Sequence, residues 1–414
     1  MSTPTDTLPL HGLPPRTAPA LDLLSGIKVL DLTSSIAGPA AGQLLADLGA
    51  AVVKIEKPGS GDDARAWGPP FLHGQSLWFM SVNRGKRSLT LDVAAPQGRE
   101  VLHALVAQAD VVLLNLVARA QRKLGLDAAT LRALNPRLVH VSITGFGLRG
   151  SRAELPCYDL IAEGYSGVMD MTGEAEMPPQ KVGTPAADLL AGNDAALAVL
   201  AALLKRERSG QGCEIDVAMI ESMSRFMAPR LLPYLGSGEL LRRSGGRDSV
   251  IAIYQVFDTA DAPLTLGLGN DGIWKRFWEA VGQPEQAARP EYASNAQRRA
   301  ARAEIVQQIQ ALLLTRPRAH WLDRFAHARV PAGPIQRLDE VAQDPGLRES
   351  GFVYRSETAA GAIPQVGLGI RFDGRSEGTG QPPPTLGAHT DEILRDWAGL
   401  PPARIEQLRA ERVI

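Results

Sequence analysis

Short apolar runs alternate with helical segments through the first third of the chain, and this alternation restricts the fold more than any other feature. The runs have the length and composition of buried strands, and the segments between them have the periodicity of helices. The expected elements are strand Ile27–Leu32, helix Ala40–Leu48, strand Ala51–Ile55, helix Gln97–Gln108, strand Val111–Leu114, helix Ala128–Leu134 and strand Leu138–Ile143. Because βαβ connections give parallel strands, the pattern predicts a doubly wound, Rossmann-like α/β domain.

Ligands in such folds bind in the loops after the strands. Three loops qualify here: Ser34–Pro39, Leu114–Val117 and Thr144–Gly150. The first lacks the GxGxxG pattern, so a nicotinamide dinucleotide is not indicated, but its Gly38-Pro39 suits the approach of a phosphate to a helix N-terminus. The basic run Asn83–Arg87 is expected to lie at the surface, the usual place for such residues.

A second glycine pattern, Gly267–Gly272, does match GxGxxG and follows a strand-like run. The polar, Pro- and Arg-rich residues 283–302 supply no second parallel strand to complete a βαβ unit. We therefore reject it as a dinucleotide site.

Asp188 is the only acid in an apolar, small-residue stretch from Val182 to Gly192. The apolar residues after it lie almost all round a helix, which predicts a buried helix that ends at the αL stop Gly210. A strand over Cys213–Met219 follows. Two interpretations of Asp188 fit the local sequence. It is either an N-cap of the helix or a functional carboxylate, which has room beside it because Ala186, Ala187 and Gly192 are small.

Composition excludes several classes of function. The 414 residues carry a net charge of −1, which gives no electrostatic case for nucleic acid or an anionic membrane. Two cysteines, Cys157 and Cys213, suit a reducing cytoplasm, and the histidines lack metal-ligand spacing, so no metal is expected. We expect no membrane span, and residues 1–23 are expected to form a disordered tail rather than a signal peptide.

In their order along the chain, the motifs resemble those of the class III CoA-transferase family, the formyl-CoA and carnitine CoA-transferase type. The resemblance runs from Leu24 to the C-terminus. It is carried by the Asp188 segment and by Gly26–Thr33, Ala37–Pro39, Leu44–Ala50, Val53–Asp62, Asn83–Asp92, Asn135–Leu138, Gly145–Gly147, Tyr158–Asp159, Ser166–Gly167, Thr172–Gly173 and Gly387–Glu392.

The resemblance implies an enzyme that uses acyl-CoA, with Asp188 as its nucleophile. An aspartate of ordinary pKa, about 3.9, is ionised at neutral pH and needs no partner base. The positions that the resemblance assigns to CoA are Ile36, Ala37, Lys57, Leu91, Asn115, Leu116, Lys123 and Tyr158. Around Asn115 the family often reads Glu-Asn-Phe and then Pro-Gly, whereas this chain reads Leu114-Asn-Leu-Val-Ala118.

The expected organisation is a large CoA-binding domain over 24–234, a small α+β domain over 235–335, and a return to the large domain over 336–414. The small domain is expected to contain the strand pair Ile251–Phe257 and Leu264–Leu268 and the helices Ala300–Leu314 and Ala319–Ala328. The family also implies an interlocked homodimer. The substrates implied are an acyl-CoA and a small carboxylic acid, and Arg242, Arg243 and Arg247 are candidates to bind a second carboxylate.

Two alternatives remain at this stage. A racemase of α-methylacyl-CoA thioesters shares the fold, but it needs a histidine where this chain has Tyr158, and tyrosine is a poor base at neutral pH. A non-catalytic CoA-binding protein has no need of the isolated Asp188.

Overall fold

The computed structural model describes residues 8–16, 21–375 and 380–414, which form two compact units. The first unit contains the described residues up to Gly167, then Val182–Pro229 and Ala342–Ile414. The second contains Val168–Lys181 and Arg230–Val341. The small domain expected over 235–335 falls inside the second unit, which also takes in the excursion 168–181.

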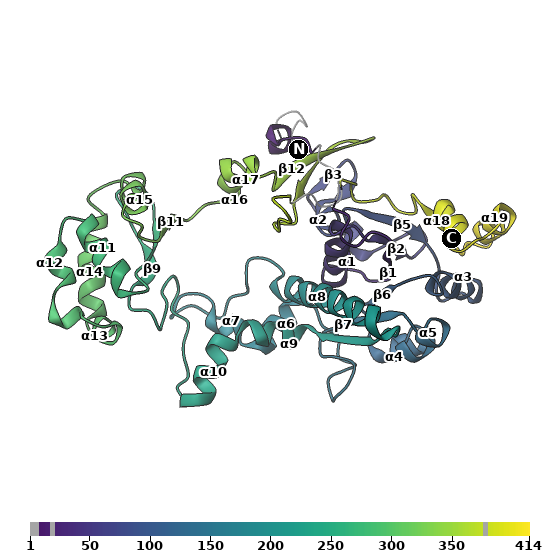
Figure 1. Ribbon diagram of the computed structural model, residues 1–414, viewed down its shortest axis with the longest axis horizontal. Helices are drawn as coiled ribbons and strands as arrows, with labels where there is room; N and C mark the ends of the chain where they lie inside the picture. Colours follow the sequence, from purple (N-terminus) through teal and green to yellow (C-terminus); the bar gives the residue numbers. More distant parts are fainter. Residues whose placement is uncertain (1–7, 17–20, 376–379) are drawn as a thin grey trace. The chain divides into compact units, whose positions relative to one another are not determined.

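A parallel sheet of six strands forms the centre of the first unit (Figure 1). Its strands are β1 (Lys28–Asp31), β2 (Ala51–Glu56), β5 (Lys86–Thr90), β6 (Val111–Leu114), β7 (Val139–Thr144) and β8 (Glu214–Ala218). Their order across the sheet is β5-β2-β1-β6-β7-β8. The chain therefore winds outward in both directions from β1 and β6, which confirms the expected parallel α/β architecture.

Helices cover both faces of this sheet. On one face α1 (Ala37–Asp47) packs closely on α8 (Ala186–Ser209), next to α6 (Asp159–Ser166) and α9 (Met219–Phe226). On the other face one apolar core joins the strands to α3 (Pro96–Val106), α5 (Ala128–Leu134), α18 (Thr390–Asp396) and α19 (Pro402–Ala410). The last two helices close this core with residues distant in sequence, including Trp397 and Leu408.

Helix α1 begins three residues before the expected start at Ala40. Pro39 is the third residue of the helix, where its missing N–H has no intrahelical partner to lose. Gly38 is therefore inside the helix and buried. Its Cα approaches Thr33 so closely that an added Cβ would lie 2.3 Å from that side chain.

Helix α8 is buried on one side only, which corrects the expectation of a helix buried all round. Its small residues Ala191, Gly192 and Ala195 face the core, whereas Leu197 and Leu204 are 62% and 66% exposed. By length and composition α8 passes the test for a membrane span, with a mean hydropathy of 1.6, and 44% of that window is buried inside the structure. We expected this helix from the sequence, but we expected no stretch long and apolar enough to span a membrane. Gly210 ends it in the αL conformation, as predicted.

The second unit is built on a small antiparallel sheet covered by helices. Its strands are β9 (Tyr254–Phe257), β10 (Leu264–Gly267) and β11 (Ala332–Pro334), in the order β11-β10-β9. The helices are α7 (Val168–Met171), α11 (Asp271–Ala280), α12 (Pro284–Ala287), α13 (Asn295–Ala300), α14 (Arg302–Leu313), α15 (Arg318–His327) and α16 (Leu338–Val341). Because β10 is antiparallel to both neighbours, the GxGxxG match at its end belongs to no βαβ unit.

The remaining elements are short. They are η2 (Pro9–Gly12), η3 (Asp63–Ala66), β3 (Phe71–Leu72), β4 (Gln75–Ser76), α2 (Leu77–Ser81), α4 (Ala118–Leu124), α10 (Ala228–Ser237), η4 (Pro290–Tyr292), α17 (Pro345–Glu349), β12 (Val353–Thr358) and β13 (Gly361–Val366). Part of the expected tail, 1–7 and 17–20, lies outside the described residues. Between these stretches Leu10 and Leu13 are buried against the β12–β13 hairpin, so this part of the segment is packed rather than loose.

Gly192 allows α8 to approach α1, and this contact gives a stability test. A Cβ at Gly192 would lie 2.7 Å from the carbonyl oxygen of Ala37 and 3.1 Å from the Cβ of Ala40. Gly192→Ala should therefore destabilise the protein by about 1–3 kcal/mol, although the same change in an open helix is favourable. Gly183→Ala is the matched control, because nothing lies within 4 Å of its added Cβ. Urea unfolding that gives equal free energies for the two variants would contradict this packing.

Candidate active site at the strand ends

Two buried lysines hold the loops that follow the first strands. The Nζ of Lys54, in the middle of β2, lies 2.7 Å from Oδ2 of Asp62 and donates to the carbonyl of Thr33 at 2.8 Å. The Nζ of Lys86 donates to Asp31 and to the carbonyl of Pro39, each at 2.7 Å. The loop after β1 and the first turn of α1 are therefore fixed by charge-assisted hydrogen bonds.

The basic run Asn83–Arg87 is not the surface cluster that its composition suggested. Arg84 is ion-paired with Asp47, and both Arg84 and Lys86 are buried. Burial alone would raise the pKa of Asp31, but the charges of Lys86 and Lys54 outweigh it and lower that pKa to about 2. Unpaired buried charges are costly, so these residues stabilise the fold only as pairs.

Another buried acid, Glu56, ties the C-terminal motif to the sheet through Ser88. Its carboxylate accepts hydrogen bonds from Arg65 at 2.7 Å and from the hydroxyl of Ser88 at 2.7 Å. Ser88 in turn accepts the N–H of Gly387 at 2.9 Å, and its own N–H donates to Nδ1 of His389 at 3.2 Å. The Gly387–Glu392 motif is thus an anchor on β5.

Asn115 joins the two loops where the winding of the sheet reverses. Its side-chain nitrogen donates to the carbonyl of Ser34 at 2.8 Å, and its side-chain oxygen accepts the N–H of Ser34 at 3.2 Å. Ser34 follows β1 and Asn115 follows β6, the two strands from which the sheet winds outward. Crevices at such points are the usual ligand sites of open α/β sheets.

A pocket of about 280 Å³ opens beside this junction, and we call it the Asp188 pocket. Four of the predicted site residues line it: Ala37, Asn115, Tyr158 and Asp188. The rest of its wall is Ser34, Ser35, Asp63, Val117, Ile143, Thr144, Gly145, Leu155, Pro156, Cys157 and Met219. The structure thus brings together residues from the ends of β1, β6 and β7 with the first turn of α8.

Asp188 is not the N-cap of α8. It is the third residue of the helix, Pro185 holds the cap position, and Pro185 supplies no side-chain acceptor. The capping acceptor comes instead from Asp159, the first residue of α6. Its Oδ1 accepts the N–H groups of Ala187 at 2.8 Å and Asp188 at 3.3 Å. Sequence reasoning missed this role of Asp159, because the two segments are far apart along the chain. The feature of the sequence that could have indicated this role is the acidic residue at the start of α6.

Residue Asp188 is 9% exposed, and within the described chain its carboxyl has neither a hydrogen-bond donor nor a basic partner. Burial, with the negative charge of Asp159 as a second cause, raises its pKa to about 7. The expectation of an ordinary, fully ionised aspartate at neutral pH is therefore wrong. A carboxyl of this kind changes its charge near neutral pH and, when ionised, is poorly solvated.

The small residues around Asp188 serve packing rather than substrate. Gly192 lies against the backbone of α1, and Ala187 is fully buried. The space beside the carboxyl is provided by the pocket wall opposite α8, which includes Gly145 and Cys157. Burial, followed by the charge of Asp188, raises the pKa of the Cys157 thiol to about 11, so it is a neutral wall residue.

An adjoining pocket of about 360 Å³, the Leu91 pocket, shares Ser34 and Asp63 with the Asp188 pocket. Its wall contains three more predicted residues, Lys57, Leu91 and Leu116. The last two predicted residues, Ile36 and Lys123, line neither pocket. Ile36 is buried against Ala40 and Val82, and Lys123 is exposed on α4, next to the lining residue Leu124.

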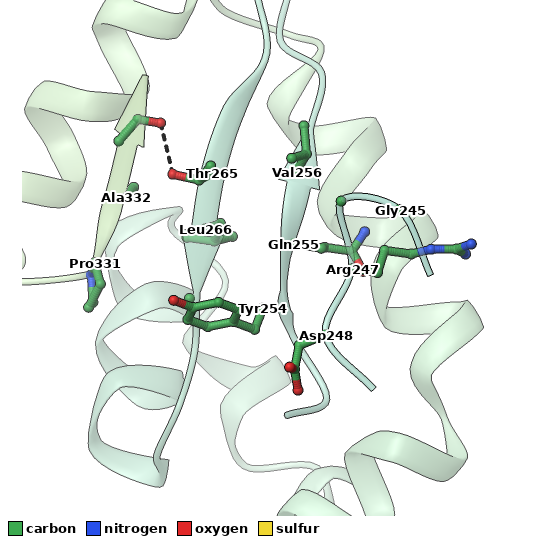
Figure 2. Close-up of a pocket in the computed structure, with 13 residues that line it drawn as sticks. Gly245, Arg247, Asp248, Tyr254, Gln255, Val256, Thr265, Leu266, Pro331 and Ala332 are labelled. Carbon is green, nitrogen blue, oxygen red and sulfur yellow. Dashed lines mark hydrogen bonds between the residues drawn. The ribbon is translucent and has the colours of Figure 1, made fainter. Parts of the chain in front are cut away.

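A further pocket, of about 600 Å³, lies inside the second unit (Figure 2). Its walls are residues 245–248, the strands β9 and β10, and Pro331–Gly333, where Thr265 donates to the carbonyl of Gly333 at 3.1 Å. Arg247 lines it, whereas Arg243 is held by Asp170 at 3.1 Å. Its one acid, Asp248, is engaged by Arg230 at 2.7 Å. Among its lining residues the pocket thus offers no unpaired carboxylate. Among the described residues, no group of His, Cys, Asp and Glu is arranged to hold a metal ion.

Comparison with known proteins places this geometry in context. A family model described as CoA-transferase family III matches residues 24–390. The succinate–glutarate CoA-transferase of Agrobacterium fabrum is 39% identical over 380 residues, covering 90% of this chain and 95% of that protein. The acetyl-CoA:oxalate CoA-transferase of Acetobacter aceti is 35% identical over 350 residues, covering 84% and 89%. The crystal structure of a CAIB/BAIF family protein from Brucella suis matches with a TM-score of 0.79 and 38% identity, covering 90% and 99%.

The raised pKa of Asp188 predicts a pH-dependent stability. Between about pH 4, the unfolded value, and about pH 7, the folded chain holds a proton that the unfolded chain releases. The free energy of unfolding of the wild-type protein should therefore fall as pH rises through this window. Asp188→Asn cannot ionise, so relative to wild type it should gain up to about 4 kcal/mol in free energy of unfolding between pH 4 and pH 8.

Asp127→Asn is the control of opposite sign. Burial alone would raise the pKa of the Asp127 carboxyl, but hydrogen bonds from Thr130 outweigh it and lower that pKa. That variant should lose stability relative to wild type above about pH 4, the unfolded value, and the loss should disappear as pH falls through the lowered folded value. Denaturant unfolding at several pH values measures both, and a pH-independent difference for Asp188→Asn would show that its carboxyl is not perturbed.

Proposed function

The chain belongs to CoA-transferase family III and is a CoA-transferase, and we propose that it moves CoA between carboxylic acids by covalent catalysis at Asp188. Family membership confirms the resemblance carried by the motifs. The observation that supports this role of Asp188 is its placement: a buried carboxyl without a basic partner in the wall of the strand-end pocket. A carboxylate that is poorly solvated and unpaired is available as a nucleophile.

The proposed reaction has two symmetrical halves. In the first, the Asp188 carboxylate attacks the thioester carbonyl of the donor, the C–S bond breaks, and an aspartyl–acyl anhydride and CoA thiolate result. The thiolate then attacks the aspartyl carbonyl of the anhydride, releases the donor acid as a carboxylate and leaves an aspartyl-CoA thioester. The acceptor carboxylate repeats these steps in reverse order, which gives the new acyl-CoA and regenerates Asp188. No proton or electron is gained or lost overall.

The first turn of α1 is the proposed site for stabilising the oxyanions of these steps. Ala37 begins the helix and lines the Asp188 pocket. The amides of Ala37 and Gly38 have no acceptor within the helix, because the first turn leaves its N–H groups unpaired. Their N–H groups, held in place by the Lys86 bond to Pro39, would lower the energy of a negative tetrahedral centre.

We propose that CoA occupies the crevice formed by the two adjoining pockets. Its reactive end would lie beside Asp188, with Tyr158 and Asn115 near it, and its remainder would pass over Leu91 and Leu116. Lys57, exposed at the edge of the Leu91 pocket, would contact the nucleotide phosphates. Ile36 and Lys123 line neither of these two pockets, so their proposed contacts with CoA rest on the family resemblance.

Short dicarboxylic acids are the proposed donor and acceptor acids. The relatives above are named for succinate, glutarate and oxalate, and their similarity to this chain covers most of its length. A coupled assay of CoA transfer between these acids and matched monocarboxylic acids tests this choice.

Racemisation of α-methylacyl-CoA is the weaker alternative. Tyr158 stands at the pocket mouth with 65% of its surface exposed, where a two-base racemase needs a histidine. Among the described residues no histidine lines the Asp188 pocket. Phenols are in general poor bases at neutral pH, because the reference pKa of tyrosine is about 10.

We also propose that two chains form a homodimer in a reducing cytoplasm. The support for the dimer is the exposed apolar surface of helices that the single chain leaves uncovered, including Leu197 and Leu204 of α8 and Leu232 and Leu235 of α10. Such surfaces usually mark interfaces.

Covalent loading of Asp188 is the direct test. Incubation with succinyl-CoA followed by hydroxylamine should yield a hydroxamate on the peptide that contains Asp188, detected by mass. Asp188→Ala should lose both the adduct and CoA transfer, with at least about a 10³-fold fall in rate. In heavy water, a 2-methylacyl-CoA should acquire no deuterium at its α-carbon. Rapid deuteration without an adduct would favour the racemase, and an active Asp188→Ala would falsify the proposed mechanism.

Lys57→Ala tests the proposed phosphate contact. The nucleotide phosphates of CoA are far from the reacting thioester, so a contact with them contributes mainly to binding. KM for the acyl-CoA should therefore rise about tenfold with little change in kcat. Lys205→Ala is the control, because Lys205 is also exposed in the first unit but lines neither pocket. Steady-state kinetics with equal KM values for the two variants would remove Lys57 from the CoA site.

A further inference from the structure

Asp159 is held between two helices but does not line the Asp188 pocket. It is the first residue of α6, and its Oδ1 accepts the N–H groups of the second and third residues of α8, at 2.8 and 3.3 Å. Those two residues are Ala187 and Asp188. An acceptor at this place normally belongs to the residue that precedes the helix, but that residue here is Pro185.

The course of the chain explains why this contact matters for the position of α8. Between Asp159 and Ala187 the chain leaves the first unit, contributes residues 168–181 to the second unit, and returns at Val182. Two acids of α6 receive the returning segment: Glu163 accepts the N–H of Val182 at 2.9 Å, and Asp159 accepts the opening amides of α8. The contact of Asp159 therefore fixes where α8 starts, and with it the Cα of Asp188.

The charge of Asp159 also reaches the Asp188 carboxyl. After burial, it is the remaining cause of the raised pKa of Asp188. The titratable groups that face Asp188 from the surrounding elements are Asp159 on α6, Cys157 and Tyr158 before it, and Asp63 across the pocket. None of these is basic, so within the described parts of the chain no cation beside Asp188 offsets the repulsion between the two carboxylates.

We propose that Asp159 is a positioning residue of the reaction, which orients Asp188 through its backbone and keeps its carboxylate reactive by repulsion. The two hydrogen bonds place the nucleophile, and the like charge raises the energy of the ionised Asp188 in the free enzyme. Attack on a thioester carbonyl moves that charge from the Asp188 carboxylate to the thioester oxygen and then to the CoA thiolate, which relieves the repulsion. This inference rests on the proposed role of Asp188 as nucleophile.

Two substitutions separate the hydrogen bonds from the charge. Asp159→Asn keeps an oxygen that can accept the two amides but removes the charge. The acid limb of its kcat/KM profile should therefore move to lower pH, with a smaller loss of kcat. Asp159→Ala removes both, and a misplaced nucleophile should lower kcat about 100-fold. KM for acyl-CoA should change little in either, because Asp159 lines neither pocket.

Asp344→Asn and Asp344→Ala are the matched controls. Asp344 also caps a helix, through the N–H of Leu347 at 3.0 Å, and it lines neither pocket. Both controls should keep the wild-type pH profile and kcat. A loss of kcat in the Asp344 variants equal to that of Asp159→Ala would assign the effect to general stability and overturn the proposal.

A second measurement is independent of turnover. The pH-dependent gain in stability caused by Asp188→Asn should be smaller in an Asp159→Asn background than in wild type, because one cause of the raised pKa is gone. An equal gain in the two backgrounds overturns the charge effect even if Asp159→Ala fails to fold. If Asp188→Ala keeps its activity, the proposed function fails. If it is inactive while Asp159→Asn keeps the wild-type pH profile and Asp159→Ala keeps the wild-type kcat, only the proposal for Asp159 fails.

Discussion

Two lysines with no contact to solvent, Lys54 and Lys86, hold the end of the sheet at which the pockets open. A buried ammonium group is stable only with an acid beside it and acceptors around it, so each lysine fixes the groups that surround it. Lys54 binds Asp62 and the carbonyl of Thr33, and Lys86 binds Asp31 and the carbonyl of Pro39. The loop after β1 and the start of α1 are therefore held by buried groups of the chain itself.

The other wall of the Asp188 pocket depends on close helix packing. Small residues on the inner face of α8, Gly192 above all, bring its backbone against α1. Asp188 is then buried with the helix and loses most of its hydration. The fold thus places a carboxyl where its charge is disfavoured, next to a second acid that serves as a cap. Functional sites commonly keep groups in such unfavourable states, and the surrounding core supplies the stability that permits it.

The same network extends to the end of the chain. Ser88, whose hydroxyl donates to Glu56, binds Gly387 and His389 of the Gly387–Glu392 motif. Helices α18 and α19 complete the core beneath β2 and β5. A segment that follows a complete second unit therefore stabilises the strands that carry Lys54 and Lys86. This explains in physical terms how a motif far from Asp188 in sequence can matter to the site without lining its pocket.

The sequence by itself determined the features that depend on near neighbours. Residue periodicity predicted most strands and helices of the parallel domain, and it placed β6 and α5 at their observed bounds. The end of α8 at Gly210 was also predicted correctly, because a glycine in the αL conformation depends only on the local backbone. The isolation of Asp188 among small residues also marked it as unusual. Strand β5 was missed because its polar residues Lys86, Arg87 and Ser88 resemble a surface loop until their partners are known.

Only the tertiary structure decided which charges are buried, which face of α8 is covered, and how Asp188 ionises. Each of these depends on groups distant in sequence: Asp31 for Lys86, α1 for Gly192, and Asp159 for the first turn of α8. Desolvation and Coulomb interactions are set by what surrounds a group in space, and a linear pattern carries that information only where the neighbours in space are also neighbours in sequence.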